Sequence, residues 1–238
     1  MNTSQGVLQV WAQGDWVTRS VFAALLLMSL ASWIVIALKA LGVVQAKRQA
    51  ARVEGFWRSA DMAEGLAKLG GNGGNPFREL AIEGREAAAH HRAHRAQLHD
   101  ALDVSDWISR SLRNSIDAST GKLQSGLAIL ASVGSTAPFV GLFGTVWGIY
   151  HALMKIGAAG QASIDQVAGP IGEALIMTAL GLAVAIPAVL GYNALVRGNK
   201  HILAKLGRFA HDLHACYVTG ARVTAASSDG NVVALKRS

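Results

Sequence analysis

The run from Val167 to Val196, VAGPIGEALIMTALGLAVAIPAVLGYNALV, contains a single formally charged side chain, that of Glu173. An α-helix needs about 20 apolar residues to cross a bilayer, so this run predicts a transmembrane helix. A carboxyl group inside the bilayer costs about 2.5–3.5 kcal/mol on insertion scales, and such acids usually face a cavity, a partner or a proton path. The run therefore predicts an integral membrane protein, with Glu173 as its first candidate functional residue.

Two further apolar blocks precede this run. Ser20 to Leu38 reads SVFAALLLMSLASWIVIAL, and the second block extends from Leu123 to Met154. Charged residues collect between the first two blocks and after the third, which is typical of a membrane protein. The first block lacks the basic leader and the small-residue cleavage site of a signal peptide, so we expect an uncleaved anchor. The sequence thus predicts an all-α fold with three transmembrane helices.

Basic residues set the expected orientation. Those after the first block are Lys39, Lys47, Arg48 and Arg52, and those after the third are Arg197, Lys200, Lys205 and Arg208. Before the first block stand only Asp15 and Arg19. Because cytoplasmic loops are enriched in lysine and arginine, we expect the N-terminus outside and the C-terminus in the cytoplasm.

The charged segment after the first span is expected to be a helical cytoplasmic domain, divided by GGNGGNP at Gly70 to Pro76. Beyond that break, residues recur at spacings of three and four: Leu98, Leu102, Ser105, Ser109, Leu112, Ile116, Ser119 and Leu123. This spacing predicts one face of a long helix that runs towards the second span. The third helix is expected to extend beyond the membrane and join this domain through Ile202, Leu206, Phe209, Leu213 and Tyr217.

These patterns predict the following organisation. A periplasmic amphipathic N-terminus spans 1–18, with Trp11 and Trp16 suited to the membrane interface, although a frayed terminus is the competing interpretation. Transmembrane helices span 19–41, 125–154 and 167–196, and the cytoplasmic domain spans 42–124. A periplasmic turn covers 155–166, and a cytoplasmic helix with a flexible tail covers 197–238.

Small residues form a stripe on each of the last two predicted spans. In the second span they are Gly134, Pro138, Gly141, Thr145 and Gly148, and in the third they are Ala174, Thr178, Gly181, Ala185 and Ala188. Their spacing of three and four places each set on one helix face, where small residues let membrane helices approach closely. Pro138 should bend its helix and free a backbone carbonyl. Pro187 shares the neighbouring face on which Glu173 lies.

Several other functions lack support in the sequence. The net charge of +7 is not gathered with stacking aromatic residues, so we expect no nucleic-acid partner. Cys216 is the only cysteine, and the histidines at 90, 91, 94 and 99 lack a metal-binding motif. No phosphate-binding loop and no nucleophile–base pair appears, so we expect neither an enzyme nor a bound metal or cofactor.

Physical reasoning alone leaves two interpretations of Glu173 open. Pro170 suits the first turn of a helix, which would make Glu173 an ordinary acid near a positive helix terminus. The apolar residues Val167 to Gly172 favour a position within the bilayer instead. A proton path through Glu173 would need a second ionisable group, and the spans offer only His151 near the outer end of the second. We therefore expect a partner chain to supply it. Thr145 and Thr178 tilt the balance towards function, with a hydrogen bond from each hydroxyl to its own helix backbone as the competing interpretation.

Two stretches resemble the bacterial proton-driven stator family that includes ExbB, TolQ and the flagellar MotA proteins. They are APFVGLFGTVWGIYHAL, from Ala137 to Leu153, and AGPIGEALIMTALGLAVAIPAV, from Ala168 to Val189. The three spans and the large loop after the first agree with the family pattern. The motifs are most similar to those of the ExbB and TolQ members.

The resemblance implies a homopentamer in the bacterial inner membrane, with the second and third helices around a central pore. In ExbB-like members, that pore holds single-span ExbD helices whose aspartate takes part in proton movement. The resemblance further implies that the complex couples the proton-motive force to TonB, which lies on the outside of the oligomer, and that membrane lipids surround the complex. The resemblance also implies that Glu173 is the family's functional glutamate and that Thr145 and Thr178 are its pore-facing threonines.

Two alternatives remain at this point. The first is a TolQ-like stator of the Tol-Pal cell-envelope system, which the motifs barely separate from the ExbB type. The second is a membrane scaffold that conducts nothing. A flagellar stator fits less well, because those chains usually have four spans.

Overall fold

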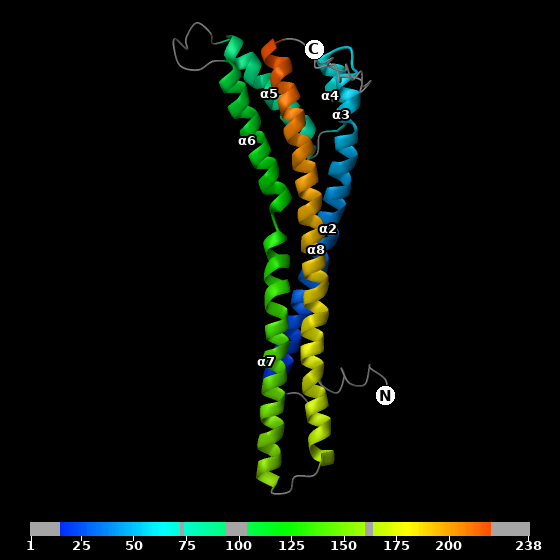
Figure 1. The fold of residues 1–238 in the computed structure, drawn as a ribbon, viewed down its shortest axis with the longest axis vertical. Coiled ribbons are helices and arrows are strands. Elements are labelled where there is room, and N and C mark those ends of the chain that lie inside the picture. The colour runs from blue at the N-terminus through cyan, green and yellow to red at the C-terminus, as the bar shows by residue number, and fades with distance from the viewer. Residues whose placement is uncertain (1–14, 72–73, 94–103, 160–163, 220–238) are drawn as a thin grey trace, which may run out of the picture. The chain divides into compact units, whose positions relative to one another are not determined.

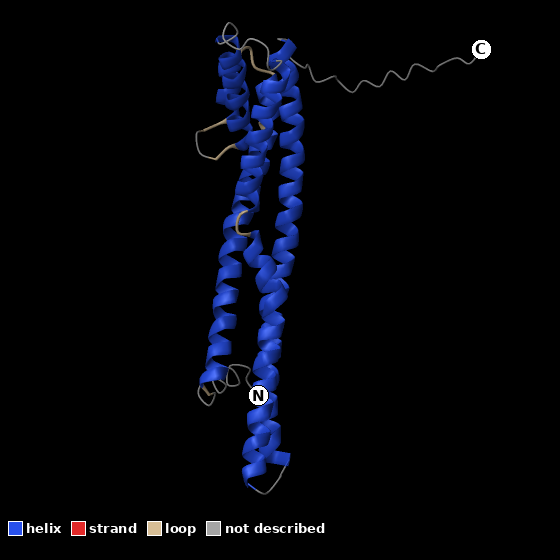
Figure 2. Ribbon diagram, turned by 90° about the vertical axis from the view of Figure 1, so that its left-hand side faces the viewer, coloured by secondary structure: helices blue, strands red, loops and turns tan. Residues whose placement is uncertain are grey.

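The computed structural model describes residues 15–71, 74–93, 104–159 and 164–219 (Figures 1 and 2). Within these ranges the regular structure is helical throughout, which confirms the all-α prediction. The helices are α2 (Trp16–Ala51), α3 (Val53–Trp57), α4 (Met62–Leu69), α5 (Pro76–Ala93), α6 (Val104–Gln124), α7 (Leu127–Ala159) and α8 (Ile164–Thr219). The predicted amphipathic segment up to residue 14, His94, His99 and the tail from residue 220 lie outside the described residues.

Three helical stretches are long and apolar enough to cross a membrane, as the sequence predicts. They are Trp16–Trp57, Val104–Met154 and Ala174–Thr219. The chain divides into two compact units. The first unit comprises 1–45 and 120–202, and the second comprises 46–119 and 203–238.

In the first unit, α7 runs antiparallel beside the first part of α8, and the beginning of α2 packs against this pair (Figure 1). Val17, Val21 and Leu25 of α2 are buried there. They contact a shared cluster with Ala137 of α7 and Met177 of α8. Apolar side chains on one face of α2 therefore hold the α7–α8 pair from one side.

A break separates α6 from α7 at Ser125 and Gly126, where Gly126 adopts φ +79°. The last carbonyl groups of α6 have no helical donors and need partners from elsewhere. The Lys39 Nζ atom donates to the Lys122 carbonyl at 3.0 Å and to Ser125 Oγ at 2.8 Å. The Asn199 Nδ2 atom donates to the Leu123 carbonyl at 2.9 Å. Side chains from α2 and α8 thus fix the position at which α7 begins.

The second unit is built around a buried cluster from several helices. Its fully buried side chains include Phe77 and Leu80 of α5, Ile108 of α6, and Leu206, Phe209 and Leu213 of α8. The stripe predicted for α8 is therefore the buried face. In α6, Leu112 and Ser119 are buried as expected, but the fully buried Ile108 was absent from the predicted stripe.

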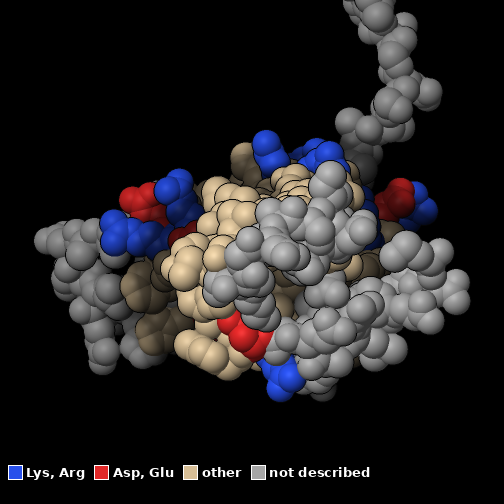
Figure 3. Space-filling view, turned by 90° about the horizontal axis from the view of Figure 1, so that it is seen from below, with Lys and Arg blue, Asp and Glu red and all other residues tan. Residues whose placement is uncertain are grey.

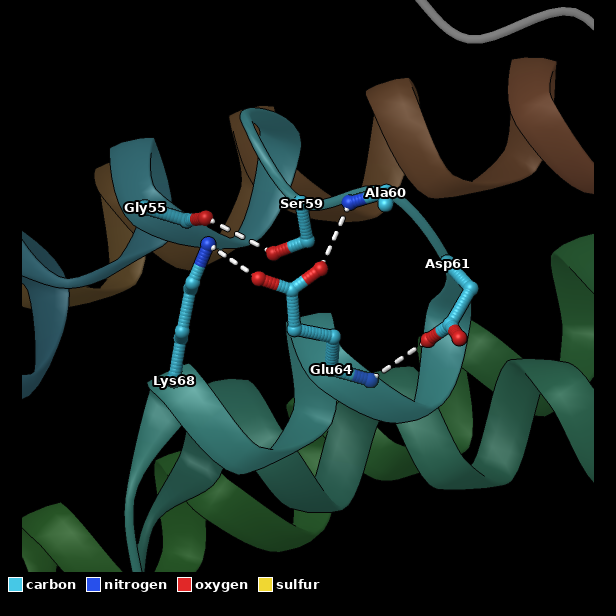
Figure 4. Close-up of polar contacts among 6 residues, drawn as sticks. All are labelled: Gly55, Ser59, Ala60, Asp61, Glu64 and Lys68. Carbon is cyan, nitrogen blue, oxygen red and sulfur yellow. Dashed lines mark hydrogen bonds and ion pairs between the residues drawn. The ribbon is translucent and has the colours of Figure 1, made fainter.

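The short connection between α3 and α4 is stabilised by a reciprocal cap (Figure 4). The Asp61 carboxylate accepts the Glu64 backbone N–H at 2.7 Å, and the Glu64 carboxylate accepts the Ala60 N–H at 2.7 Å. Glu64 also forms an ion pair with Lys68 at 2.7 Å. Such caps satisfy the free N–H groups at a helix start.

The Asn199 contact yields a prediction about stability. Asn199 is buried, so Asn199→Ala leaves the Leu123 carbonyl without its side-chain donor and should cost about 1–3 kcal/mol. We expect a lower apparent melting temperature for the detergent-solubilised protein. Asn193→Ala, which alters an exposed asparagine on the same helix, is the control and should change stability by less than about 0.5 kcal/mol. Equal melting temperatures for the two variants would contradict the assigned role.

Candidate functional site: a hydroxyl pair between two membrane helices

The small-residue stripes of α7 and α8 meet at Gly141 and Gly181. Their Cα atoms lie so close that a Cβ atom added to Gly141 would lie 3.0 Å from the Gly181 Cα and 2.6 Å from the Met177 carbonyl oxygen. A Cβ atom added to Gly181 would lie 2.7 Å from the Ala137 carbonyl oxygen. No larger residue fits either position without separating the helices.

The same close approach continues in both directions along the pair. Gly134 lies against the Val189 side chain, with 2.5 Å between an added Cβ and the nearest Val189 atom. Gly148 lies against Ala174, where the corresponding distance is 3.0 Å. The stripes identified in the sequence therefore lie at one helix–helix contact within a single chain.

Thr145 of α7 and Thr178 of α8 meet beside the glycine contact. Thr145 is only 6% exposed, and its Oγ1 atom forms a hydrogen bond with Thr178 Oγ1. The Thr145 Oγ1 atom also lies 3.1 Å from the Gly141 carbonyl oxygen and 3.1 Å from the Ala174 carbonyl oxygen. The Gly141 contact is the bond to the same helix, four residues back, that is common for buried threonines.

The number of protons available constrains this cluster. A threonine hydroxyl has one hydrogen to donate, and carbonyl oxygens only accept. If Thr145 donates to a carbonyl, then Thr178 donates to Thr145. If Thr178 instead donates elsewhere, Thr145 can donate to Thr178. The pair can therefore exchange donor and acceptor roles without moving heavy atoms, inside an apolar helix contact.

The remaining predicted site residues lie along the same helices. Glu173 precedes Ala174 in α8, but its side chain lies outside the described part of the structure. Pro138 lies within α7 and is partly buried; its ring nitrogen leaves the Gly134 carbonyl without a helical donor. Pro187 lies within α8 and is partly buried.

A second polar cluster joins α2 to α7 and was not found from the sequence. Asp15 Oδ2 accepts the Trp147 indole N–H at 2.7 Å, and Asp15 Oδ1 accepts the Thr18 backbone N–H at 2.9 Å. The Trp147 ring lies against the His151 ring, with centroids 4.4 Å apart. The sequence marks Asp15 only as a charge before the first span, because a contact between residues 132 positions apart leaves no periodic pattern.

Opposing effects act on the Asp15 carboxyl, which lies just before the first span. Its partial burial raises the pKa, while the hydrogen bonds from Thr18 and Trp147 and the nearby His151 lower it. The pKa lies below its ordinary value because the lowering effects together are larger. Asp15 is therefore ionised near neutral pH and accepts hydrogen bonds as a carboxylate.

Viewed from the end at which α7 ends and α8 begins, lysine, arginine, aspartate and glutamate appear mainly at the margins (Figure 3). Among the residues whose placement is described, no group of three or more metal-ligating side chains comes together. His90 instead stacks on Trp107, with ring centroids 6.0 Å apart.

Comparison with known proteins places these features in a family. The model of the MotA/TolQ/ExbB proton channel family matches residues 82–207, more than half of the chain. That segment contains Thr145, Thr178 and Glu173, as well as the glycine contact.

Individual relatives match over most of their length. The biopolymer transport protein ExbB of Xanthomonas campestris pv. campestris (strain B100) is 45% identical over 214 residues, covering 88% of this chain and 83% of the relative. The ExbB protein of Neisseria meningitidis serogroup B (strain MC58) is 43% identical over 210 residues, covering 86% and 94%. The Tol-Pal system protein TolQ of Pseudomonas aeruginosa (strain PAO1) is 34% identical over 203 residues, covering 84% and 87%.

The glycine contact makes a prediction about packing. Gly141→Ala should force α7 away from α8, because its Cβ would collide with backbone atoms. Overpacking of this kind costs about 1–3 kcal/mol, so the melting temperature in detergent should fall. Gly157→Ala, also in α7, is the control, since no atom lies within 4 Å of the added Cβ. That variant should be neutral or slightly stabilised, because alanine favours helix. A Gly141→Ala protein as stable as the control would rule out the tight contact.

Proposed function

Since the chain belongs to the MotA/TolQ/ExbB proton channel family, we propose that it is an ExbB-like stator subunit of the bacterial inner membrane. In this proposal it forms a proton-driven complex with an ExbD-like chain and energises TonB-dependent transport across the outer membrane. The observation that carries it is the 43–45% identity to ExbB proteins over most of the chain, against 34% to a TolQ protein.

The apolar faces of the single chain support an oligomer. Along α7, large side chains on the surface include Phe139, Leu142, Phe143, Val146 and Tyr150, each at least half exposed. Such side chains need lipid or a neighbouring helix around them. We infer that copies of the chain, five in the family pattern, surround a pore that receives the single-span helices of the ExbD-like partner.

Glu173 is the proposed proton-carrying group of this chain. A carboxyl group can take up a proton from one side of the membrane and release it on the other, which is the role proposed for Glu173. Ala174, the next residue, offers its carbonyl to Thr145. The Thr145–Thr178 pair is therefore close along the chain to the glutamate. Thr145 is buried between α7 and α8, so in this proposal the partly buried Thr178 supplies the polar lining and Thr145 is its hydrogen-bond partner.

The charge distribution supports the proposed orientation. Lys39 lies at the end of the first apolar block, and Arg197 and Lys200 follow the third. Placing these ends in the cytoplasm puts the N-terminus in the periplasm and the C-terminus in the cytoplasm. The connection between α7 and α8 then faces the periplasm, where a TonB-like protein would meet the outside of the complex.

Glu173→Gln is the direct test of the proposed function. The amide is similar in shape but cannot exchange a proton at neutral pH. We expect normal assembly with the ExbD-like partner and loss of energised iron–siderophore uptake in cells that depend on this chain. Normal uptake by the variant would reject the proposed function. If a variant with alanine at Glu173, Thr145 and Thr178 still supported normal uptake, the non-conducting scaffold would be favoured.

The hydroxyl pair makes a separate prediction. Thr145→Val keeps the side-chain shape but removes the hydroxyl, so the Thr178 hydroxyl loses its hydrogen-bond partner on α7. We expect proton flux to fall by about tenfold, measured in vesicles that contain the chain and its partner with a pH-sensitive dye. Thr145→Ser retains the hydroxyl and serves as the control. Equal flux in the valine and serine variants would contradict a role for this hydroxyl.

Phenotype separates the ExbB-like from the TolQ-like alternative. Deletion of the gene should produce iron starvation with siderophores as the iron source if the chain is ExbB-like. Detergent sensitivity with normal siderophore use would instead favour the TolQ-like assignment.

A further inference from the structure

We propose that Asp15 and Trp147 form a clasp that fixes the beginning of α2 on α7 and thereby holds the Thr145–Thr178 pair in its working position. Asp15 and Trp147 are positioning residues in this proposal, which rests on the proposed proton-driven function. Neither residue touches the hydroxyl pair, so the effect must pass through the packing between them.

The first step is the hydrogen bonding of Asp15. Each carboxylate oxygen accepts a hydrogen bond from a different helix. Oδ1 accepts the backbone N–H of Thr18 in α2, and Oδ2 accepts the indole N–H of Trp147 in α7. Asp15 precedes the first residue of α2, so the Thr18 bond is an ordinary N-terminal cap. A cap needs only one oxygen. The second bond, 2.7 Å to the indole, joins α2 to α7 and is stronger than a neutral bond because its acceptor is charged.

The second step is the environment of the clasp on α7. The His151 Nδ1 atom lies 3.2 Å from the Trp147 carbonyl oxygen, and the His151 ring lies tilted against the Trp147 ring with centroids 4.4 Å apart. Because a carbonyl only accepts, Nδ1 carries the hydrogen in this contact. The Tyr150 ring meets the His151 ring edge to face, with centroids 5.3 Å apart. The Trp147 ring is therefore held by a hydrogen bond at its indole nitrogen and by a ring contact with His151.

The third step runs down α2 to the glycine contact. Val21 is buried, and a Cβ added to Gly144 would lie 3.0 Å from its Cγ1 atom. The same point lies 3.2 Å from Cβ of Met177, which is 1% exposed. Gly144 and Met177 immediately precede Thr145 and Thr178 in the sequence. Any shift of the beginning of α2 therefore reaches the residues that adjoin both hydroxyls.

This chain of contacts distinguishes the clasp from a simple cap. Asp15→Asn keeps an oxygen for Thr18, and asparagine caps helices as well as aspartate does. Its remaining polar group is an NH₂ donor, which cannot accept the indole N–H. Trp147→Phe removes the same bond from the other side and retains an aromatic ring against His151. The two variants should consequently behave alike.

The test compares Asp15→Asn, Trp147→Phe and the double variant in vesicles that contain the chain with its ExbD-like partner. Flux is measured with a pH-sensitive dye and expressed per assembled complex. We expect each single variant to lower flux by about tenfold and the double variant to fall no further, because both remove one bond. Trp33→Phe, an exposed tryptophan on α2, is the control and should match wild type.

Backbone hydrogen exchange over residues 141–148 provides a readout that does not depend on conduction. Both single variants should raise it relative to Trp33→Phe. Unchanged exchange, unchanged flux per complex, or additive losses in the double variant would overturn the clasp. Absence of flux in wild type would instead reject the proposed function, and the exchange measurement would then decide whether the clasp exists.

Discussion

The close approach of α7 and α8 at Gly141 and Gly181 is the contact on which the rest of the first unit depends. Lipid supplies no hydrophobic drive for helix association, so close packing and buried hydrogen bonds must hold the pair together. Glycine permits the backbone contact, and that contact brings Thr145 within hydrogen-bonding distance of Thr178 and the Ala174 carbonyl. The Thr145 hydroxyl thus lies in an apolar interface and still has hydrogen-bond partners there.

Polar side chains outside this interface fix where α2 begins, where α6 ends and where α7 begins. Lys39 and Asn199 supply donors for α6 carbonyls, and Asp15 supplies acceptors for α2 and α7. These contacts lie towards the two ends of the apolar segments, where ionised groups are less costly than at mid-membrane. Apolar and small residues set how closely the helices pack, while the polar contacts set their register along one another.

The sequence predicted the features that repeat along one helix. Spacings of three and four identified the buried faces of α7 and α8 because a helix face is a local property. Contacts between distant segments have no such signal. The Asp15–Trp147 bond joins residues 132 positions apart, and the break at Gly126 is one glycine among many small residues. In α6, the predicted stripe includes Ser109 in place of the buried Ile108, since both positions fit a spacing of three and four.

The unbroken length of α8 has a consequence for how the chain can evolve. One stripe of α8 continues from Ala174 to Leu213 in alternating steps of four and three residues. It includes Leu195, Ile202 and Leu206. Adding or removing one residue would rotate everything downstream by about 100°, turning a buried stripe towards solvent or lipid. The α6–α7 break can accommodate an inserted or deleted residue, because α6 and α7 are separate helices and the buried face of one does not set that of the other. Length variation among related chains should therefore collect at that break and be excluded from α8.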